Sequence, residues 1–352
     1  MMCIEYAILL MKVGSSIIFV LPSEPGLPSE YVRAQSLFGV EPNGWKFLFY
    51  RRASSKQKKN KYWMYLSSLR DLVKGINALE ESSSKVYLIK PLSVIEIIAL
   101  KLFIRSPVYI DVNDPYHLEE FLGPNSLLKF KLIAYLCDGM IFESWENFNY
   151  HDIWVQKKSI VVEDTAQFVP SLELAADESK QKTVVWVGSP KTSNVLLDTI
   201  DALKIFVSFD YDLELLGASD EVSKTLIANN IDANVQTSYD REFMTKRLSV
   251  ASISFVPMPD SNLFNLRGNL KAKLAMAFGC IVVAQNNEMH RRLIMPSSTG
   301  FLFSTDSDLE AILVEIENKQ NREKIRKGAI NYVQKYFTPQ KHAQLLVDFF
   351  ER

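Results

Sequence analysis

Short apolar runs rich in Val, Ile and Phe recur along the chain and alternate with segments of helical spacing. Such runs are typical of strands buried on both faces of a parallel sheet, with the helical segments as crossover connections. The first half predicts strands at 17–21, 46–50, 85–89, 107–111, 139–142 and 159–162, and helices in the gaps between them, notably at 60–80 and 92–104. The second half predicts strands at 183–187, 213–216, 234–236, 252–256 and 280–284, and helices from about 192 and at 220–229, 239–248, 270–278, 306–317, 319–335 and 338–351.

This alternation predicts an α/β protein with two Rossmann-like, doubly wound parallel-sheet domains in tandem. A chain of 352 residues is longer than one hydrophobic core usually supports. The segment 169–182 loses the periodicity and becomes acidic and polar, so we expect it to link a domain of residues 1–168 to one of residues 183–337. Because ligands of open parallel sheets bind outside the carboxyl ends of the strands, the expected site is the cleft between the domains.

The composition excludes several classes of protein. The 40 Lys and Arg residues balance the 41 Asp and Glu residues, so no overall field favours a nucleic acid. Cys3, Cys137 and Cys280 are far apart in apolar surroundings, which argues against a disulfide framework and a metal cluster. Glu5 and Lys12 interrupt the apolar N-terminal segment, which we expect to form a short helix rather than a signal peptide. These features predict a cytoplasmic protein.

The stretch VVWVGSPKTSNVL (184–196) places a glycine turn between a strand and a helix. Gly188 lacks a Cβ and lets a ligand approach the backbone, while Ser189 and Thr192 offer hydroxyls beside the first helical amides. Lys191 adds a mobile positive charge. The turn is a candidate phosphate cradle, and a tight turn capped by Thr192 with nothing bound is the alternative.

The stretch NLRGNLKAKLAMAFGCIVVAQ (265–285) is more informative. Arg267 and Lys271 are four residues apart, so both can approach one anion near the start of a helix. Cations at a helix N-terminus oppose the helix dipole, and a bound polyanion removes that conflict. The apolar residues that follow imply burial, which disfavours the alternative of a solvated basic face.

These two stretches, with TGFLFSTDSDLEAIL (299–313) and NYVQKYFTPQKHAQLL (331–346), resemble the donor domain of nucleotide-sugar-dependent glycosyltransferases of the GT-B fold, closest to family 4. The resemblance covers residues 183–352 in sequence and the first half in layout. It implies that Gly188, Ser189, Arg267 and Lys271 hold the donor diphosphate, and that residues 338–352 return to the first domain. It also implies a reaction without a metal or a cofactor other than the nucleotide-sugar co-substrate.

The chain departs from the family at two carboxylates. The family has one glutamate that would fall at Leu266 and a second, which binds the nucleotide ribose, that would fall at Leu274. Hydrogen bonds to a charged group contribute about 1.5–3 kcal/mol each, so these replacements are expected to weaken donor binding unless another group substitutes. Asn269 and Asn265 are the neutral candidates for that substitution.

The first half is expected to supply the acceptor side and the catalytic group. The loop PSEPGLPSEYVR (22–33) resembles the family's acceptor-side loop, with Gly26 and Arg33 as contributors, or it is an ordinary connection. In YIDVNDPYHLEE (109–120), Asp111 and His117 follow a strand and are candidates for stabilising charge or accepting the acceptor's proton. The alternative reading of this loop is a helix cap at Asn113 or Asp114 before Pro115. Glu163 is a further candidate in the cleft.

The segment Arg51–Lys61 is basic, contains no acidic residue and precedes Tyr62, Trp63 and Tyr65. Basic residues beside aromatic ones suit an anionic membrane surface. A solvated loop is the alternative, and a nucleic-acid patch is the third and least favoured reading. The expected location is therefore cytoplasmic, with peripheral contact at the inner face of the membrane.

Taken together, the sequence predicts a glycosyltransferase that moves a sugar from a nucleotide-diphosphate sugar to a hydroxyl of a glycan or lipid-linked acceptor, in cell-surface polysaccharide or glycoconjugate synthesis. The alternative is a catalytically inactive GT-B homologue that acts as a binding or scaffold subunit. The replaced glutamates favour the scaffold, whereas Arg267 and Lys271 favour the enzyme.

Overall fold

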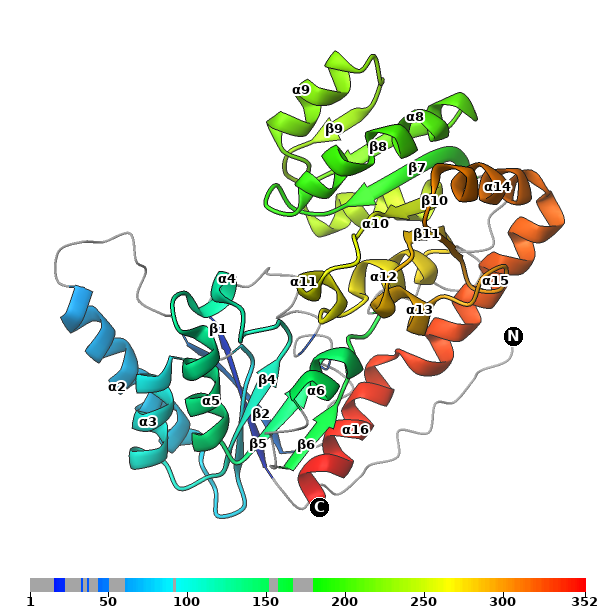
Figure 1. Cartoon of the computed structure of the whole chain (residues 1–352). Coiled ribbons are helices and arrows are strands. Elements are labelled where there is room, and N and C mark those ends of the chain that lie inside the picture. The colour runs from blue at the N-terminus through cyan, green and yellow to red at the C-terminus, as the bar shows by residue number, and fades with distance from the viewer. Residues whose placement is uncertain are drawn as a thin grey trace. The chain divides into compact units, whose positions relative to one another are not determined.

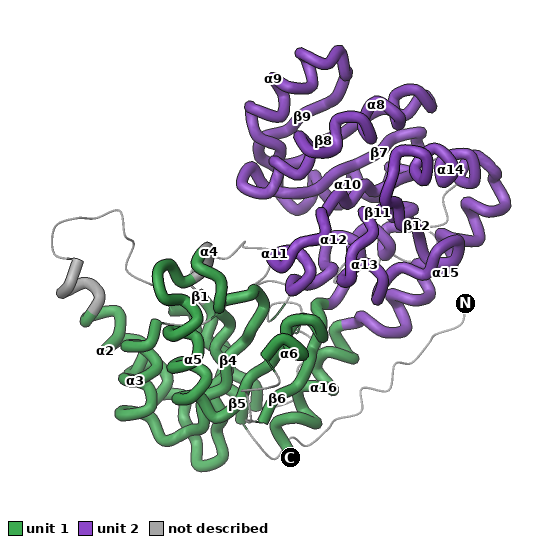
Figure 2. The backbone as a smooth tube through the Cα atoms, in the orientation of Figure 1, with its two compact units in different colours: residues 1–164, 339–352 green, residues 165–338 purple. Residues whose placement is uncertain are grey.

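The computed structural model describes residues 16–22, 33, 37, 44–50, 61–90, 93–151, 158–166 and 180–352. The chain forms two compact units, the first of residues 1–164 with 339–352 and the second of residues 165–338 (Figure 2). Each unit is built on one six-stranded sheet, and every strand pairing in both sheets is parallel. The predicted α/β architecture of two doubly wound parallel sheets is confirmed.

The sheet of the first unit has the strand order β2-β1-β3-β4-β5-β6 (Figure 1). The elements of this unit are β1 (Ile17–Pro22), β2 (Trp45–Tyr50), α2 (Lys61–Leu79), β3 (Lys85–Leu88), α3 (Val94–Phe103), β4 (Val108–Val112), α4 (Glu119–Leu122), α5 (Ser126–Leu136), β5 (Gly139–Phe142), α6 (Trp145–His151), β6 (Lys158–Val161) and α16 (Pro339–Glu351).

Successive side chains of β1 alternate between the two faces of this sheet, as the period of two in a strand requires. Ile18 and Val20 pack in a core with residues of α2, α3 and α5. Phe19, from the opposite face, packs in a second core with residues of α16. Both faces of the sheet are therefore covered, which explains why the strands read as continuous apolar runs.

Helix α16 completes the first unit although it comes last in the sequence (Figure 1). Its Phe349 and Phe350 rings pack edge to face against Tyr109 of β4, with ring centres 5.6 and 4.9 Å apart. Phe350 also contacts Tyr87 of β3 at 6.0 Å. These contacts anchor the helix on one face of the first sheet.

The boundary between the units comes earlier than the sequence predicts. Residues 165–168 were expected in the first domain, but the second unit begins at Thr165. The backbone amide of Ala166 donates to the carbonyl of Phe337 at 2.9 Å. The Ala166 side chain is fully buried in the core of the second unit, which explains the shift.

The sheet of the second unit has the order β12-β11-β10-β7-β8-β9. The elements of this unit are β7 (Gln181–Val187), a 3-10 helix (Ser193–Thr199), α8 (Ile200–Ser208), β8 (Asp212–Leu216), α9 (Asp220–Ala228), β9 (Asn234–Gln236), α10 (Arg241–Val250), β10 (Ala251–Val256), α11 (Asn262–Asn265), α12 (Leu270–Ala277), β11 (Ile281–Gln285), α13 (Glu288–Leu293), β12 (Phe301–Phe303), α14 (Asp306–Glu317) and α15 (Lys319–Tyr336).

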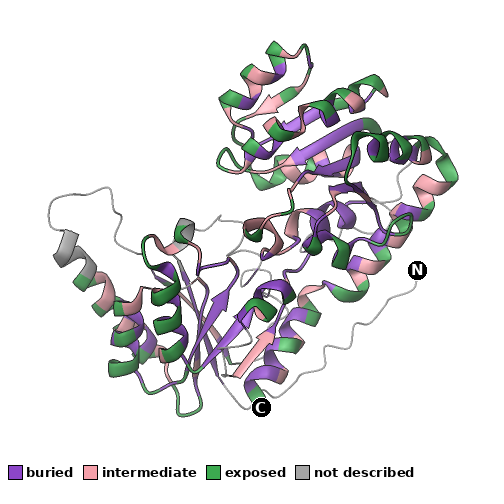
Figure 3. Ribbon diagram, in the orientation of Figure 1, coloured by how far each residue is buried: buried purple, intermediate pink, exposed green. Residues whose placement is uncertain are grey.

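The strands of both units are largely buried, whereas the helices have exposed outer faces (Figure 3). Trp186 and Phe255 lie in a core with residues of α8, α9 and α14. Val185 and Val256 lie on the opposite face, in a core with residues of α10, α12 and α15. The second unit therefore repeats the layering of the first.

The sequence left several short elements without bounds. It placed helices in the gaps between the first strands without giving bounds for α4, α5 or α6, and it did not predict α11, α13 or the strand β12. The helix expected from about 192 begins as a 3-10 helix and becomes α-helical at Ile200. Among the residues described above, no helix combines the length and the apolar character needed to cross a bilayer.

Candidate functional site

The second unit has a topological switch point between β7 and β10. The chain starts at β7, adds β8 and β9 on one side, and then crosses to build β10, β11 and β12 on the other. The connections that leave β7 and β10 therefore diverge at the carboxyl ends of two adjacent parallel strands. This is the position where ligands bind in open α/β sheets. The turn at Gly188 follows β7, and the segment with Arg267 and Lys271 follows β10.

Gly188 is held by both of its backbone polar groups. Its amide donates to the carbonyl of Leu216 at 2.8 Å, and its carbonyl accepts from the Tyr239 hydroxyl at 2.8 Å. A Cβ added at Gly188 would lie 2.1 Å from Cη2 of Trp186. The sequence suggested that this glycine serves the approach of a ligand. The structure shows that the space of the missing side chain is filled by the Trp186 indole.

The turn after Gly188 is closed by its own hydroxyl groups. The Ser189 amide donates to Oγ1 of Thr192 at 3.2 Å, and the Thr192 amide donates to the Ser189 carbonyl at 2.9 Å. Ser189 and Lys191 are exposed at the tip of the turn. The hydroxyl of Ser189 and the ammonium of Lys191 are thus open to solvent, whereas the two amides already have partners.

Lys271 connects the two stretches that the sequence singled out. Its Nζ lies 5.2 Å from the centre of the Trp186 ring, within the range of a cation–π interaction. Burial, and then the positive charge of Arg267, lower the pKa of Lys271 to about 8. No carboxylate in the described part of the chain pairs with Lys271. Arg267 thus acts electrostatically on Lys271, and Lys271 lies beside the ring that packs against Gly188.

Asn269 precedes α12 and is 8% exposed. Its side-chain amide donates to the carbonyl of Met289 at 2.8 Å, but its Oδ1 has no hydrogen-bond partner in the described structure. The Asn269 side chain does not cap α12. A helix N-terminus without a side-chain cap leaves backbone amides available to an anion.

The two leucines that replace the family glutamates are buried. Leu266 and Leu274 are each 8% exposed. Leu274 lies one turn after Lys271 on α12, so the helix presents an apolar side chain where a ribose-binding carboxylate would stand.

In the first unit, Arg33 and Asp111 form a buried ion pair. Both side chains are 0% exposed. Arg33 Nε donates to Oδ1 of Asp111 at 3.0 Å, and its terminal nitrogens contact the same carboxylate, the Val162 carbonyl and Asp164. Burial raises the pKa of Asp111, and Arg33 offsets part of that rise. This corrects two expectations, since neither Arg33 as an acceptor contact nor Asp111 as a catalytic group is presented to a ligand.

The sequence missed two carboxylates beside this pair. Glu143 follows β5 and Asp164 lies just beyond β6, so both stand at the carboxyl edge of the sheet. Burial, and then the charge of Asp164 and a hydrogen bond with it, raise the pKa of Glu143 well above its usual range. Glu143 therefore holds its proton to a higher pH than an ordinary glutamate does, and it forms a hydrogen bond with Asp164. The rule that selected Asp111 at the end of β4 would also have found Glu143.

His117 stands in the loop between β4 and α4 and is 7% exposed. Its ring stacks on Tyr150 of α6 at 4.4 Å, and its Nδ1 has no hydrogen-bond partner in the described structure. Burial lowers the pKa of His117, which favours the neutral imidazole that a general base requires. Glu163 is partly buried after β6, and Gly26 lies outside the described residues.

Comparison with known proteins shows which solved structures share this fold. No family model matches the sequence, and no curated protein matches it. Among solved structures, HepE of Anabaena with UDP and glucose gives a TM-score of 0.70 at 12% identity over 96% of this chain and 99% of that chain. Sucrose-phosphate synthase of Thermosynechococcus elongatus gives 0.68 at 15% identity over 96% and 98%. TarM gives 0.64 at 14% identity over 81% of this chain and 58% of its own length.

At these identities the likeness concerns the fold. It covers both sheets, because 96% of the chain is matched by HepE and by sucrose-phosphate synthase. It agrees with the sequence resemblance noted for residues 183–352. The chain has the GT-B fold and is similar in structure to the glycosyltransferases that share it.

Proposed function

We propose that the protein is a glycosyltransferase that takes a nucleotide-diphosphate sugar as donor and a hydroxyl of a glycan or lipid-linked molecule as acceptor. The observation that carries the proposal is the convergence of Arg267 and Lys271 beside the Gly188 turn, at the switch point of the second sheet. Two neighbouring cations suit a diphosphate, and Lys271 has no carboxylate partner among the described residues. HepE, which shares the fold, has been solved with UDP and with UDP-glucose.

In this proposal each predicted donor residue has a role. Arg267, Lys271 and the backbone amides at the start of α12 neutralise the diphosphate. Gly188, Ser189, Lys191 and Thr192 border the same space, and Asn269 offers its unpartnered Oδ1 to a hydroxyl of the nucleotide or sugar. Because the leucines 266 and 274 replace carboxylates, phosphate contacts supply most of the affinity.

The first unit would supply the acceptor side. We assign His117 as the group that accepts the acceptor's proton, because it stands at the carboxyl edge of the sheet, keeps 7% exposure, and has an Nδ1 without a hydrogen-bond partner in the described structure. The family resemblance implies transfer without a metal, so turnover should survive treatment with EDTA. We also propose peripheral contact of Arg51–Lys61 with an anionic membrane. Its residues 51–60 lie outside those that the structure describes.

The donor site is tested by calorimetric titration with UDP, GDP and a panel of their sugars. We expect micromolar binding of one nucleotide by the wild type and loss of that binding in Arg267→Ala, Lys271→Ala. The variant Lys224→Ala, Lys324→Ala removes the same charge from exposed positions on α9 and α15 and should bind normally. If the folded wild-type protein binds no nucleotide, the transferase proposal fails. Binding without turnover on any acceptor would instead support a scaffold.

A further inference from the structure

The helices α2, α3 and α5 lie side by side on one face of the first sheet, with α3 between the other two (Figure 1). Their inner side chains pack in one core against the strands. Because each of these helices connects parallel strands, all three run in the same direction, opposite to the strands. Their outer sides therefore form one layer of parallel helices.

The outer side of α3 is apolar and exposed. Ile95, Ile98 and Leu102 recur at helical spacing on one side of the helix, and Leu102 is 71% exposed. Phe103 ends the helix and is 64% exposed. The middle helix of the layer thus presents a row of apolar side chains to solvent.

Helix α5 carries a second row beside the first. Leu128, Leu132 and Tyr135 follow the same helical spacing, and Tyr135 is 75% exposed. Leu127 beside them is also exposed. We call Leu128, Leu132 and Tyr135 the α5 ridge.

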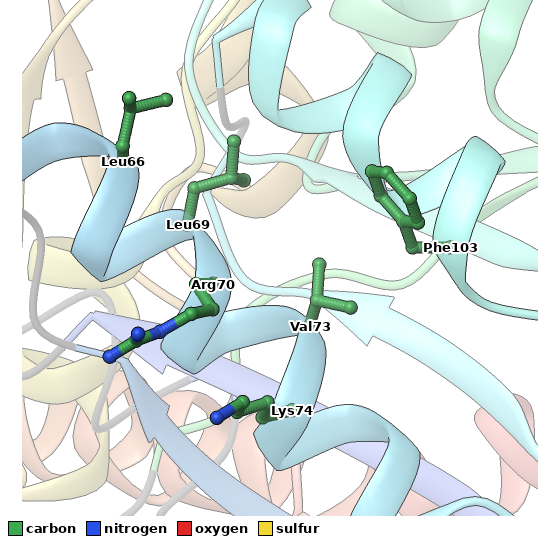
Figure 4. Close-up of a pocket in the computed structure, with 6 residues that line it drawn as sticks. All are labelled: Leu66, Leu69, Arg70, Val73, Lys74 and Phe103. Atoms are coloured by element: carbon green, nitrogen blue, oxygen red, sulfur yellow. The ribbon is translucent and has the colours of Figure 1, made fainter.

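On the other side of α3 the layer is hollowed. A groove of about 280 Å³ runs between α2 and α3, lined by Leu66, Leu69, Arg70, Val73, Lys74 and Phe103. Leu69 and Val73 lie on the side of α2 that faces Phe103, whereas Arg70 and Lys74 extend away from it (Figure 4). We call this hollow the α2–α3 groove. The same layer therefore carries an apolar ridge on one side of α3 and an apolar groove on the other.

The exposed apolar area of this layer is large enough for a stable protein interface. Taking roughly 200 Å² for a large apolar residue, the exposed apolar residues of α3 and α5 together offer about 900 Å². A standard interface needs about 800 Å² from each partner. Single apolar residues on a surface are ordinary, whereas a contiguous patch of this size marks an interaction site.

Both signs of charge border the apolar residues. Lys101 Nζ lies 2.7 Å from Oδ2 of Asp138, and Arg70 Nε lies 3.6 Å from Oδ1 of Asp71. All four side chains are partly exposed. An apolar centre with a polar, charged rim is the composition of a protein–protein interface. A face that carries both signs can also meet a copy of itself, because cations of one copy can lie near carboxylates of the other.

We propose that the outer layer of α2, α3 and α5 joins two copies of this chain, related by a twofold axis that runs along α3. Such an axis reverses the order of the helices, so α5 of one copy faces α2 of the other. The α5 ridge then enters the α2–α3 groove of the second copy, and the same contact forms reciprocally on the other side of the axis. A twofold axis across the helices would instead set ridge against ridge and leave both grooves empty.

The ends of the helices indicate which side chains meet. The ion pair between Lys101 and Asp138 shows that α3 and α5 end at the same level. Tyr135, near the end of α5, is therefore level with Phe103 at the end of α3, and an axis along α3 keeps that level. Tyr135 of each copy is then the anchor that fills the groove beside Phe103 of the other. The proposal goes beyond sugar transfer and does not rest on the donor site.

The test measures the molar mass of the full chain by sedimentation equilibrium over a range of concentrations. Tyr135→Lys places a positive charge on the α5 ridge, and Phe103→Asp places a negative charge in the α2–α3 groove. The matched control, Ile227→Asp with Val314→Asp, changes residues of α9 and α14 in the second unit that are 73% and 64% exposed. Thermal melts check that each variant is folded.

We expect the wild type to form a dimer with a dissociation constant in the micromolar range or below. Tyr135→Lys and Phe103→Asp should each raise this constant by about tenfold or more, because buried aromatic anchors carry much of the binding energy of an interface. The control should dimerise as the wild type does.

A mixture of the two variants tests the arrangement of the copies. A homodimer of either variant has both ridge–groove contacts altered. In the mixed dimer one contact is intact, and the other pairs the introduced ammonium with the introduced carboxylate. The mixture should therefore dimerise at least about tenfold more tightly than either variant alone.

Three results would overturn the proposal. The first is a wild type that stays monomeric up to about 100 µM, which leaves the layer to a different partner. The second is a dimer that neither variant weakens, because its interface then lies elsewhere on the chain. The third is a mixture that dimerises no better than the separate variants, which excludes the axis along α3. Nucleotide titration of the same preparations is a separate measurement, so failure of the dimer is distinguished from failure of the donor site.

Discussion

The ammonium of Lys271 lies 5.2 Å from the centre of the Trp186 ring, and the same ring fills the space that a side chain at Gly188 would need. Trp186 is therefore the common neighbour of the glycine turn and of the basic helix start. It orients a cation by its π face while keeping water from one side of it.

The charge of Lys271 should make nucleotide binding depend on pH. With its pKa lowered to about 8, Lys271 loses its proton as the pH rises from about 7 to about 9. A diphosphate needs the protonated form, so affinity should fall by about tenfold over this range, as expected for loss of one charged hydrogen bond. Calorimetry at several pH values measures the fall. Lys271→Arg keeps its charge, and a fall as steep as that of the wild type in this variant would contradict the prediction.

Without ligand, Lys271 should also make the free energy of unfolding depend on pH. Between about pH 8 and pH 10.5 the unfolded lysine is protonated while the folded one is largely neutral. The unfolded state then binds more protons, so the free energy of unfolding gains a positive slope with pH in that window. Lys271→Met should lose this contribution in urea titrations. An unchanged slope would show that Lys271 titrates normally.

Gly188→Ala should destabilise the second unit. The new Cβ would lie 2.1 Å from Cη2 of Trp186, and that ring is buried in the core of the second unit. Overpacking of this kind costs about 1–3 kcal/mol. Thermal unfolding measures the loss of stability. When Trp186→Leu is already present, adding Gly188→Ala should cost less stability than it costs in the wild type. An equal cost in both proteins would mean that the backbone at Gly188, rather than the ring, sets the requirement.

Asp111→Asn should lower the free energy of unfolding by about 3–5 kcal/mol, because it leaves the buried Arg33 guanidinium without its main counter-charge. The double variant Arg33→Met, Asp111→Leu removes both charges and should be less destabilised than Asp111→Asn. Urea denaturation of the two variants provides the comparison. If the double variant is the less stable one, the pair contributes more than its desolvation costs.

Glu143→Gln should change how stability responds to pH. The raised pKa of Glu143 means that the folded protein holds a proton which the unfolded chain releases above about pH 4.5. The folded state then binds more protons, so this group lowers stability as the pH rises toward its folded pKa. Relative to wild type, Glu143→Gln should be more stable at about pH 8 than at about pH 5. The exposed Glu221→Gln serves as control and should show no such trend.

The strands could be predicted because buried parallel strands need continuous apolar runs. The residues at the switch point of the second sheet, Gly188, Arg267 and Lys271, could be predicted because the family resemblance named them. The same rule about strand ends also selected Asp111, but it could not show that Arg33 reaches that carboxylate. Such pairing depends on long-range packing, which no local pattern contains. The bounds of the short helices α4, α6 and α11 could not be predicted for a related reason, since a helix of few residues is stabilised by its surroundings more than by its own sequence.

The place of α16 affects how the protein is made. The 13 residues of this helix cover one face of the first sheet, where Phe349 and Phe350 pack on Tyr109, yet they are synthesised after the whole second unit. During translation the nascent first unit therefore carries an uncovered apolar sheet face until α16 has left the ribosome. Premature termination before α16 would leave that face open to chaperones and to aggregation, even in a chain whose second unit is intact.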